Sequence, residues 1–92
     1  MLQVHFGRPL HRFFPVLEQG PLEVQATTAA EVLAAVEAQV PGLRDYIVDE
    51  RGALRPHVNF FIGDATLVDR KRLSDRVPEH GTVHILQALS GG

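Results

Sequence analysis

The sequence contains no cysteine among its 92 residues. This absence excludes a disulfide scaffold, a thiolate metal site and a cysteine nucleophile. The sequence also lacks any apolar run that approaches the roughly 18 residues needed to span a bilayer. Its first residues do not show the pattern of a signal peptide. We therefore expect a cytoplasmic protein with no membrane partner.

A strong excess of charge of either sign is also missing, because the formal net charge is −2. A general affinity for nucleic acid or for anionic membrane is therefore not expected. Arg70, Lys71 and Arg72 are adjacent, but Asp69 and Asp75 flank them. Three basic charges provide little affinity for phosphates, so this run predicts a solvated loop rather than a nucleic-acid site.

What the sequence does contain is typical of a small globular protein. Hydrophobic residues make up 45% of the chain and charged residues 22%, both ordinary values. Ninety-two residues can build one hydrophobic core, near the lower end of the size range of stable domains. We therefore expect a single domain over residues 1–92, with residues 88–92 as a flexible tail.

Alternating apolar and polar residues predict several strands. In the first of them Leu2, Val4 and Phe6 would face the core, and in the last Val83 and Ile85 would do so while His84 faces outward. The predicted strands cover residues 2–6, 22–25, 57–63, 65–68 and 82–87. Residues 7–21 are punctuated by glycine and proline and predict a long connection or an irregular hairpin, whose Phe13 and Phe14 would pack onto the body.

One helix is predicted after Thr28, which is a good N-cap and has Glu31 three residues later, the spacing of a capping box. Apolar residues recur at helical spacing and would bury one stripe of the helix. They are Val32, Leu33, Val36 and Val40. Pro41-Gly42 would end the helix. Residues 43–48 predict a further turn or short strand.

These elements predict an α+β fold, a mixed sheet of four to five strands with one main helix across one face. The last strand is strongly apolar, so we expect it at the centre of the sheet, parallel to the first. The helix then supplies part of the right-handed connection between them. This is the arrangement of the β-grasp fold.

The sequence closes with Gly91-Gly92, separated by three residues from the last predicted strand. Residues 88–92 span roughly 16–18 Å when extended, and two glycines allow the backbone to enter a narrow channel. A partner that uses ATP can convert a C-terminal carboxylate into an acyl-adenylate, and a sulfur donor can then replace AMP. The tail is therefore interpreted as a carrier arm. A frayed terminus or a cloning scar remain the alternatives.

Three stretches of the sequence resemble the MoaD/ThiS family of ubiquitin-like sulfur carriers. The stretches are Thr28–Val36, Leu54–Asp64 with its Arg-x-x-Val-Asn run, and Gly81–Gly92 with its Gly-Gly end. The chain departs from the family at Gln87, where many relatives have proline, and in residues 68–76, which are more charged than usual. Its length and the run Leu-Arg-Pro-His-Val-Asn look closer to the longer, cysteine-pathway type of carrier.

The resemblance implies that an E1-like enzyme adenylates Gly92 with ATP, and that the resulting thiocarboxylate donates sulfur to a biosynthetic enzyme. The recipients in the family make cysteine, molybdopterin, thiamine or thiolated tRNA. The protein itself would hold no cofactor and would not be an enzyme, and ATP would be used by the activating partner. With no cysteine in the chain, the sulfur would be carried on the C-terminal carboxyl group.

A docking surface is predicted where Phe61, His84 and Leu86 share the outer face of the sheet. Cover of this face by the loop that holds Phe13 and Phe14 is the alternative. The residues predicted to bind partners are these three together with Ala88, Leu89 and Ser90 beside Gly91. His5, His57 and His84 would share the same face, but their spacing is not diagnostic of a metal site, and none is predicted.

A second function remains open on the sequence alone. The chain could be a ubiquitin-like binding subunit that inserts its tail into a catalytic partner, as the small subunit of molybdopterin synthase does. Ser74 and Ser90 have no evident histidine and aspartate partners, so independent nucleophilic catalysis lacks support.

Overall fold

The computed structural model describes residues 1–87. It contains five strands, three α-helices and one 3-10 helix among these residues. In chain order they are β1 (Leu2–Phe6), α1 (Arg8–Phe13), η1 (Pro15–Gln19), β2 (Leu22–Val24), α2 (Ala29–Gln39), α3 (Arg44–Ile47), β3 (Val58–Ile62), β4 (Ala65–Thr66) and β5 (Gly81–Gln87). No helix in residues 1–87 is long and apolar enough to cross a membrane.

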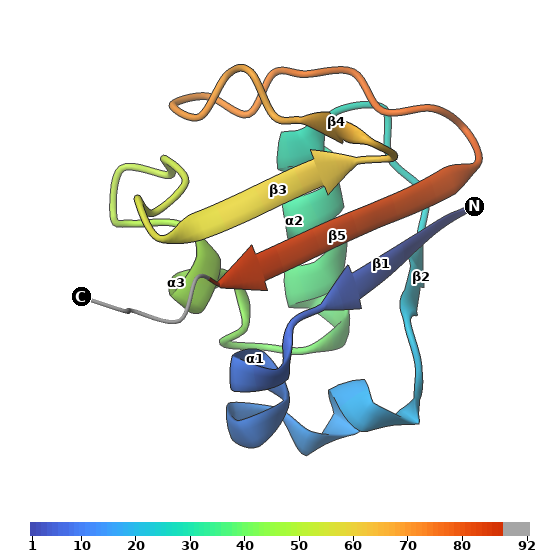
Figure 1. The fold of residues 1–92 in the computed structure, drawn as a ribbon, viewed down its shortest axis with the longest axis vertical. Helices are drawn as coiled ribbons and strands as arrows, with labels where there is room; N and C mark the ends of the chain where they lie inside the picture. The colour runs from blue at the N-terminus through green and yellow to red at the C-terminus, as the bar shows by residue number, and fades with distance from the viewer. Residues whose placement is uncertain (88–92) are drawn as a thin grey trace.

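The five strands form one mixed sheet with the order β2-β1-β5-β3-β4. β5 runs parallel to β1 and antiparallel to β3, which confirms that the last strand is central (Figure 1). A parallel pair needs a long crossover connection, and the chain between β1 and β5 supplies it through α2. Figure 1 shows α2 behind β1, β5 and β3, so one face of these strands is covered by the main helix.

The core lies between α2 and the covered face of the sheet. Val4 pairs with Val83, and Phe60 pairs with Ile85, so the inward positions of the three central strands meet in one layer. All four side chains are fully buried. Val32, Leu33 and Val36 of α2 are buried against them. The alternation in the sequence therefore predicted correctly which residues of the central strands face inward.

The start of α2 is capped as predicted, except that the Glu31 carboxylate bonds Thr27 and not the N-cap residue Thr28. The Thr28 hydroxyl accepts a hydrogen bond from the Glu31 backbone N–H at 3.2 Å. In return the Glu31 carboxylate accepts from the backbone N–H and the hydroxyl of Thr27, at 2.9 and 3.0 Å. A standard capping box would use the Thr28 N–H instead. The backbone hydrogen bond from Thr27 is the main reason why the Glu31 pKa is lowered.

The turn after α2 is fixed by the Glu37 carboxylate. It accepts hydrogen bonds from the backbone N–H groups of Gly42 and Arg44, at 2.8 and 2.9 Å. These two bonds are the main causes of the lowered pKa of Glu37. Gly42 has a φ of 96°, a conformation that favours glycine. This turn places α3 directly after α2, where the sequence predicted a further turn or short strand.

Residues 7–21 are more regular than predicted. They form α1 and η1 instead of an irregular hairpin. The reason is tertiary, because Leu10 and Leu17 are both buried in the core and anchor one helical turn each. Phe14 is half-buried against that core, whereas Phe13 is 58% exposed. The prediction that both phenylalanines pack onto the body is therefore right for Phe14 and only partly right for Phe13.

The charged loop between β4 and β5 is organised by the carboxylate of Asp69. This side chain accepts hydrogen bonds from the Ser74 hydroxyl and from the backbone N–H groups of Lys71, Arg72 and Ser74. These bonds, the Ser74 hydroxyl first, lower the pKa of Asp69 to about 2. The negative charge of Asp69 therefore stabilises the local structure of this loop.

Arg70 corrects the prediction of a uniformly solvated basic run. Lys71 and Arg72 are exposed, but Arg70 is half-buried. Its guanidinium donates hydrogen bonds to the carbonyl oxygens of Arg55 and Val58, at 2.7 and 2.8 Å. Arg70 thus ties the loop to the beginning of β3.

Candidate functional site

The face of the sheet opposite α2 carries a row of aromatic side chains. His5 of β1, His84 of β5 and Phe61 of β3 are cross-strand neighbours in the sheet register. Each of these residues follows or precedes a buried residue of its own strand. Neighbouring side chains of a strand point in opposite directions, so the three rings point away from the core. We call the surface formed by His5, Phe61, His84 and Leu86 the open face. Figure 1 shows no helix in front of the three strands that carry it.

The two histidines of the open face are stacked. Their ring centroids are 4.8 Å apart and the ring planes differ by 14°. Partial burial is the larger cause of a lowered pKa for His5, and the charge on His84 is the smaller one. Parallel rings direct their nitrogen lone pairs away from a common point. This pair is therefore suited to an aromatic contact surface and not to chelation of one ion.

Phe61 and Leu86 add apolar area to the open face, as predicted. Leu86 is 37% exposed and Phe61 is half-buried. Phe13 and Phe14, which were the alternative cover for this face, contact Tyr46 instead, with ring centroids 5.1 and 5.3 Å away. Grouped apolar and aromatic side chains on one exposed face are typical of a docking surface.

His57 does not join the other two histidines, which corrects the prediction that all three share the outer face. It lies in a turn before β3, whose first residue Val58 pairs with Gln87. His84 pairs instead with Phe61, four residues beyond His57, a separation of about 13 Å along the strand. In the part of the chain that the structure describes, no three His, Cys, Asp or Glu side chains are grouped to hold a metal ion.

The end of β5 is held by the body of the protein up to Gln87. The Gln87 side-chain amide lies 3.4 Å from the backbone carbonyl oxygen of Tyr46 in α3 and donates to it. Gln87 also lines a shallow hollow together with Tyr46, Arg55 and His57. The remaining predicted site residues follow directly and lie outside the described residues. They are Ala88, Leu89, Ser90, Gly91 and Gly92.

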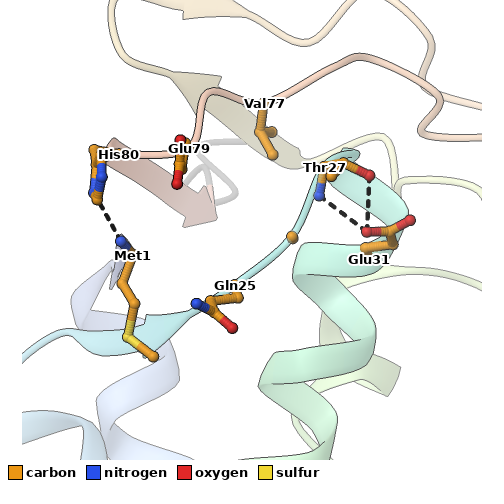
Figure 2. Close-up of a pocket in the computed structure, with 8 residues that line it drawn as sticks. Met1, Gln25, Thr27, Glu31, Val77, Glu79 and His80 are labelled. Carbon is orange, nitrogen blue, oxygen red and sulfur yellow. Dashed lines mark hydrogen bonds between the residues drawn. The ribbon is translucent and has the colours of Figure 1, made fainter.

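A larger hollow lies at the other end of the central strands. Figure 2 shows its lining, with Met1 and His80 on one side and Thr27 and Glu31 on the other. Its volume is about 530 Å³. His80 immediately precedes β5, whereas Gln87 ends it, so the full length of the strand separates this hollow from Gln87. Among residues 1–87, Gln87 and the residues around it therefore lie where the predicted carrier arm begins.

No protein-family model matches the sequence, and no curated protein matches it. Solved structures do match it over the whole chain. A chain in the crystal structure of the Amycolatopsis orientalis BexX/CysO complex superposes with a TM-score of 0.85 at 24% identity, and the match covers 100% of both chains. The chain has the ubiquitin-like β-grasp fold.

Two further structures share this β-grasp arrangement. Mycobacterium tuberculosis CysO, described as an antigen, has a TM-score of 0.83 and 21% identity, over 97% of this chain and 100% of its own. SAMP1 from Haloferax volcanii has a TM-score of 0.73 and 16% identity, over 99% of this chain and 98% of its own. These likenesses confirm the predicted fold class.

The sequence did not point to Tyr46 as a neighbour of Gln87 in this β-grasp. It was expected only in a turn or short strand, yet it contacts Gln87, 41 residues later, and both phenylalanines of the α1 region. Its exposure of 37% at the end of the central strand is a tertiary property. The one signal in the sequence was that Tyr46 is the single tyrosine of the chain.

The stacked histidines predict a pH-dependent stability. The folded-state pKa of His5 is lowered from 6.5, so the unfolded chain binds this proton more readily. Stability should then fall as the pH drops below 6.5, and the loss should stop below the folded-state pKa. We expect the His5→Gln variant to lose less stability than the wild type between about pH 7.5 and about pH 5.5. Urea unfolding at both pH values measures the difference, and equal losses in the two proteins would contradict the expectation.

Proposed function

We propose that the protein is a sulfur carrier whose Gly92 is adenylated by an E1-like enzyme and then converted into a thiocarboxylate. The proposal takes Gly92 as the carboxyl terminus of the protein. The protein is then a cosubstrate that partner enzymes act on, and ATP is consumed by the activating partner. The observation that carries the proposal is the position of β5, the central strand of a β-grasp sheet, which leads directly to the residues before Gly91-Gly92.

The central strand fixes where the carrier arm begins. Gln87 pairs with Val58 of β3 and contacts Tyr46 of α3, so the last described residue of β5 is held from two sides. Five residues follow it, and they reach at most roughly 16–18 Å. An enzyme that acts on Gly92 therefore has to approach this end of the sheet closely.

The chemistry that we propose has two steps. An oxygen of the Gly92 carboxylate attacks the α-phosphorus of ATP and displaces pyrophosphate, which gives an acyl-adenylate. Hydrosulfide, as the sulfur donor, then attacks the acyl carbon and displaces AMP, which gives the thiocarboxylate and releases a proton. No side chain of the protein needs to react, which agrees with the absence of cysteine. The role of the protein is to present the terminal carbonyl.

The open face is the proposed docking surface for the activating enzyme. Phe61, His84 and Leu86 lie together on it, and residues 88–90 would extend the contact into the enzyme. The similarity in fold to CysO supports a carrier of the longer type, and the BexX/CysO complex supports action through a partner protein. The recipient we propose is a biosynthetic enzyme that makes cysteine, molybdopterin, thiamine or thiolated tRNA.

Intact mass spectrometry tests the proposal. The protein is incubated with ATP, sulfide and its cognate activating enzyme, and we expect a gain equal to the difference between a sulfur and an oxygen atom. Omission of ATP and omission of the enzyme are the controls, and neither should give the gain. A protein that binds the enzyme but keeps its original mass would contradict the carrier and favour the binding subunit.

A further inference from the structure

A basic and aromatic surface surrounds the end of β5. Arg8, Arg12 and Phe13 of the α1 region line one hollow. Phe13 stacks on Tyr46 with ring centroids 5.1 Å apart, and Tyr46 lines the neighbouring hollow with Arg55 and Gln87. Two segments that are far apart in the sequence thus meet around the strand end. We call Arg8, Arg12, Phe13, Tyr46 and Arg55 the exit rim.

The charge of the exit rim is opposite to that of the whole chain. The exit rim contains three arginines, and among residues 1–87 Asp45 is the one acidic residue that lines the same two hollows. The formal net charge of the chain is −2. Arg8 and Arg12 are exposed, and within residues 1–87 no side chain accepts a hydrogen bond from either guanidinium. Their charge is therefore available to a partner.

The rim also offers apolar contact area. Phe13 is 58% exposed and Tyr46 is 37% exposed. Exposed aromatic rings beside arginines are the residue types that dominate the binding energy of protein interfaces. Their stacking on each other fixes both rings before binding, which reduces the entropy cost of association.

We infer that the exit rim binds an acidic surface of the activating enzyme, with Phe13 and Tyr46 as its apolar contact. This inference rests on the proposed function, because the enzyme has to come within roughly 16–18 Å of Gln87 to reach Gly92. At that distance it faces the rim. Arginine charge around the end of β5 attracts an acidic enzyme surface and orients the encounter. The open face and the exit rim then form two adjoining parts of one interface.

The test uses initial rates of pyrophosphate release by the activating enzyme with the full-length chain. We expect the Arg8→Glu/Arg12→Glu variant to lower kcat/KM at least about tenfold at low ionic strength, mainly through KM. The kcat/KM of the wild type should fall as salt is added, whereas that of the variant should depend less on salt. Phe13→Ser should lower kcat/KM at every salt concentration and leave the salt dependence unchanged.

The control is Lys71→Glu/Arg72→Glu, which changes the net charge equally. These side chains are exposed in the loop after β4, at the far edge of the sheet from β1 and α1. We expect this variant to keep a kcat/KM within about twofold of the wild type. Thermal melting confirms that each variant is folded.

Each failure has a distinct meaning. A wild-type chain that is never adenylated would refute the proposed function and this inference with it. Normal adenylation of the wild type, with the rim variant no worse than the Lys71 and Arg72 control, would refute the rim alone. Binding of a fluorescein-labelled oligouridylate by the wild type, lost in the rim variant, would reassign the rim to RNA.

Discussion

Removal of Gly91 and Gly92 is expected to abolish the gain in mass completely. The shortened chain would end at Ser90, so its carboxylate could not reach as far into an active site, and its last residue would carry a side chain where a narrow channel requires glycine. The buried residues described here lie between Leu2 and Ile85. We therefore expect the melting temperature of the shortened chain to match that of the full chain.

A matched variant separates the terminal glycines from the rest of the tail. Ser90→Ala keeps the length and both glycines, and it should still gain the sulfur mass. Binding of both variants to the activating enzyme is measured in parallel by calorimetry. If the shortened chain is still converted to a thiocarboxylate, the reactive carbonyl is not that of Gly92.

Replacement of Phe60 by alanine is expected to give the largest loss of stability. Phe60 has the largest fully buried side chain among residues 1–87 and lies on β3 opposite Ile85 of the central strand. Truncation of such a ring costs about 3–5 kcal/mol, because it removes buried apolar area and leaves a cavity. A domain of this kind has about 5–15 kcal/mol of stability in total, so much of it would be lost. Urea unfolding measures the change.

The neighbouring residue is the control for Phe60. Phe61 is the same residue type on the same strand but lies on the open face, where it is half-buried. We expect Phe61→Ala to cost clearly less stability than Phe60→Ala and to weaken docking to the activating enzyme. Equal losses of stability would show that the two faces of β3 have been assigned wrongly.

Local chemistry explains why much of the fold could be predicted. The alternation in residues 2–6 and 82–87 defines the inward face of two strands, because neighbouring side chains of a strand point in opposite directions. Thr28 and Glu31 mark the start of α2 for a similar reason, since both act on backbone groups within four residues. Such signals depend only on neighbouring residues and not on distant segments of the chain.

Other elements could not be predicted because their stability comes from distant contacts. α1 and η1 form where the glycines and prolines indicated an irregular connection, since Leu10 and Leu17 find places in the core. His57 was assigned to the strand, but β3 begins one residue later at Val58. Arg70 was predicted to be solvated, yet the carbonyl oxygens of residues 55 and 58 hold it in place.

The same division applies to the candidate site. The sequence by itself determined the apolar last strand with its outward residues His84 and Leu86, the outward position of Phe61 on β3, and the two glycines at the end of the chain, because these depend on residue type and spacing. Only the tertiary structure decided that His84 stacks on His5, and that Phe13, Tyr46 and three arginines surround the end of β5. The physical reason is that these contacts join segments roughly 30 to 80 residues apart in the sequence. The packing of α2 on the sheet sets the relative position of these segments.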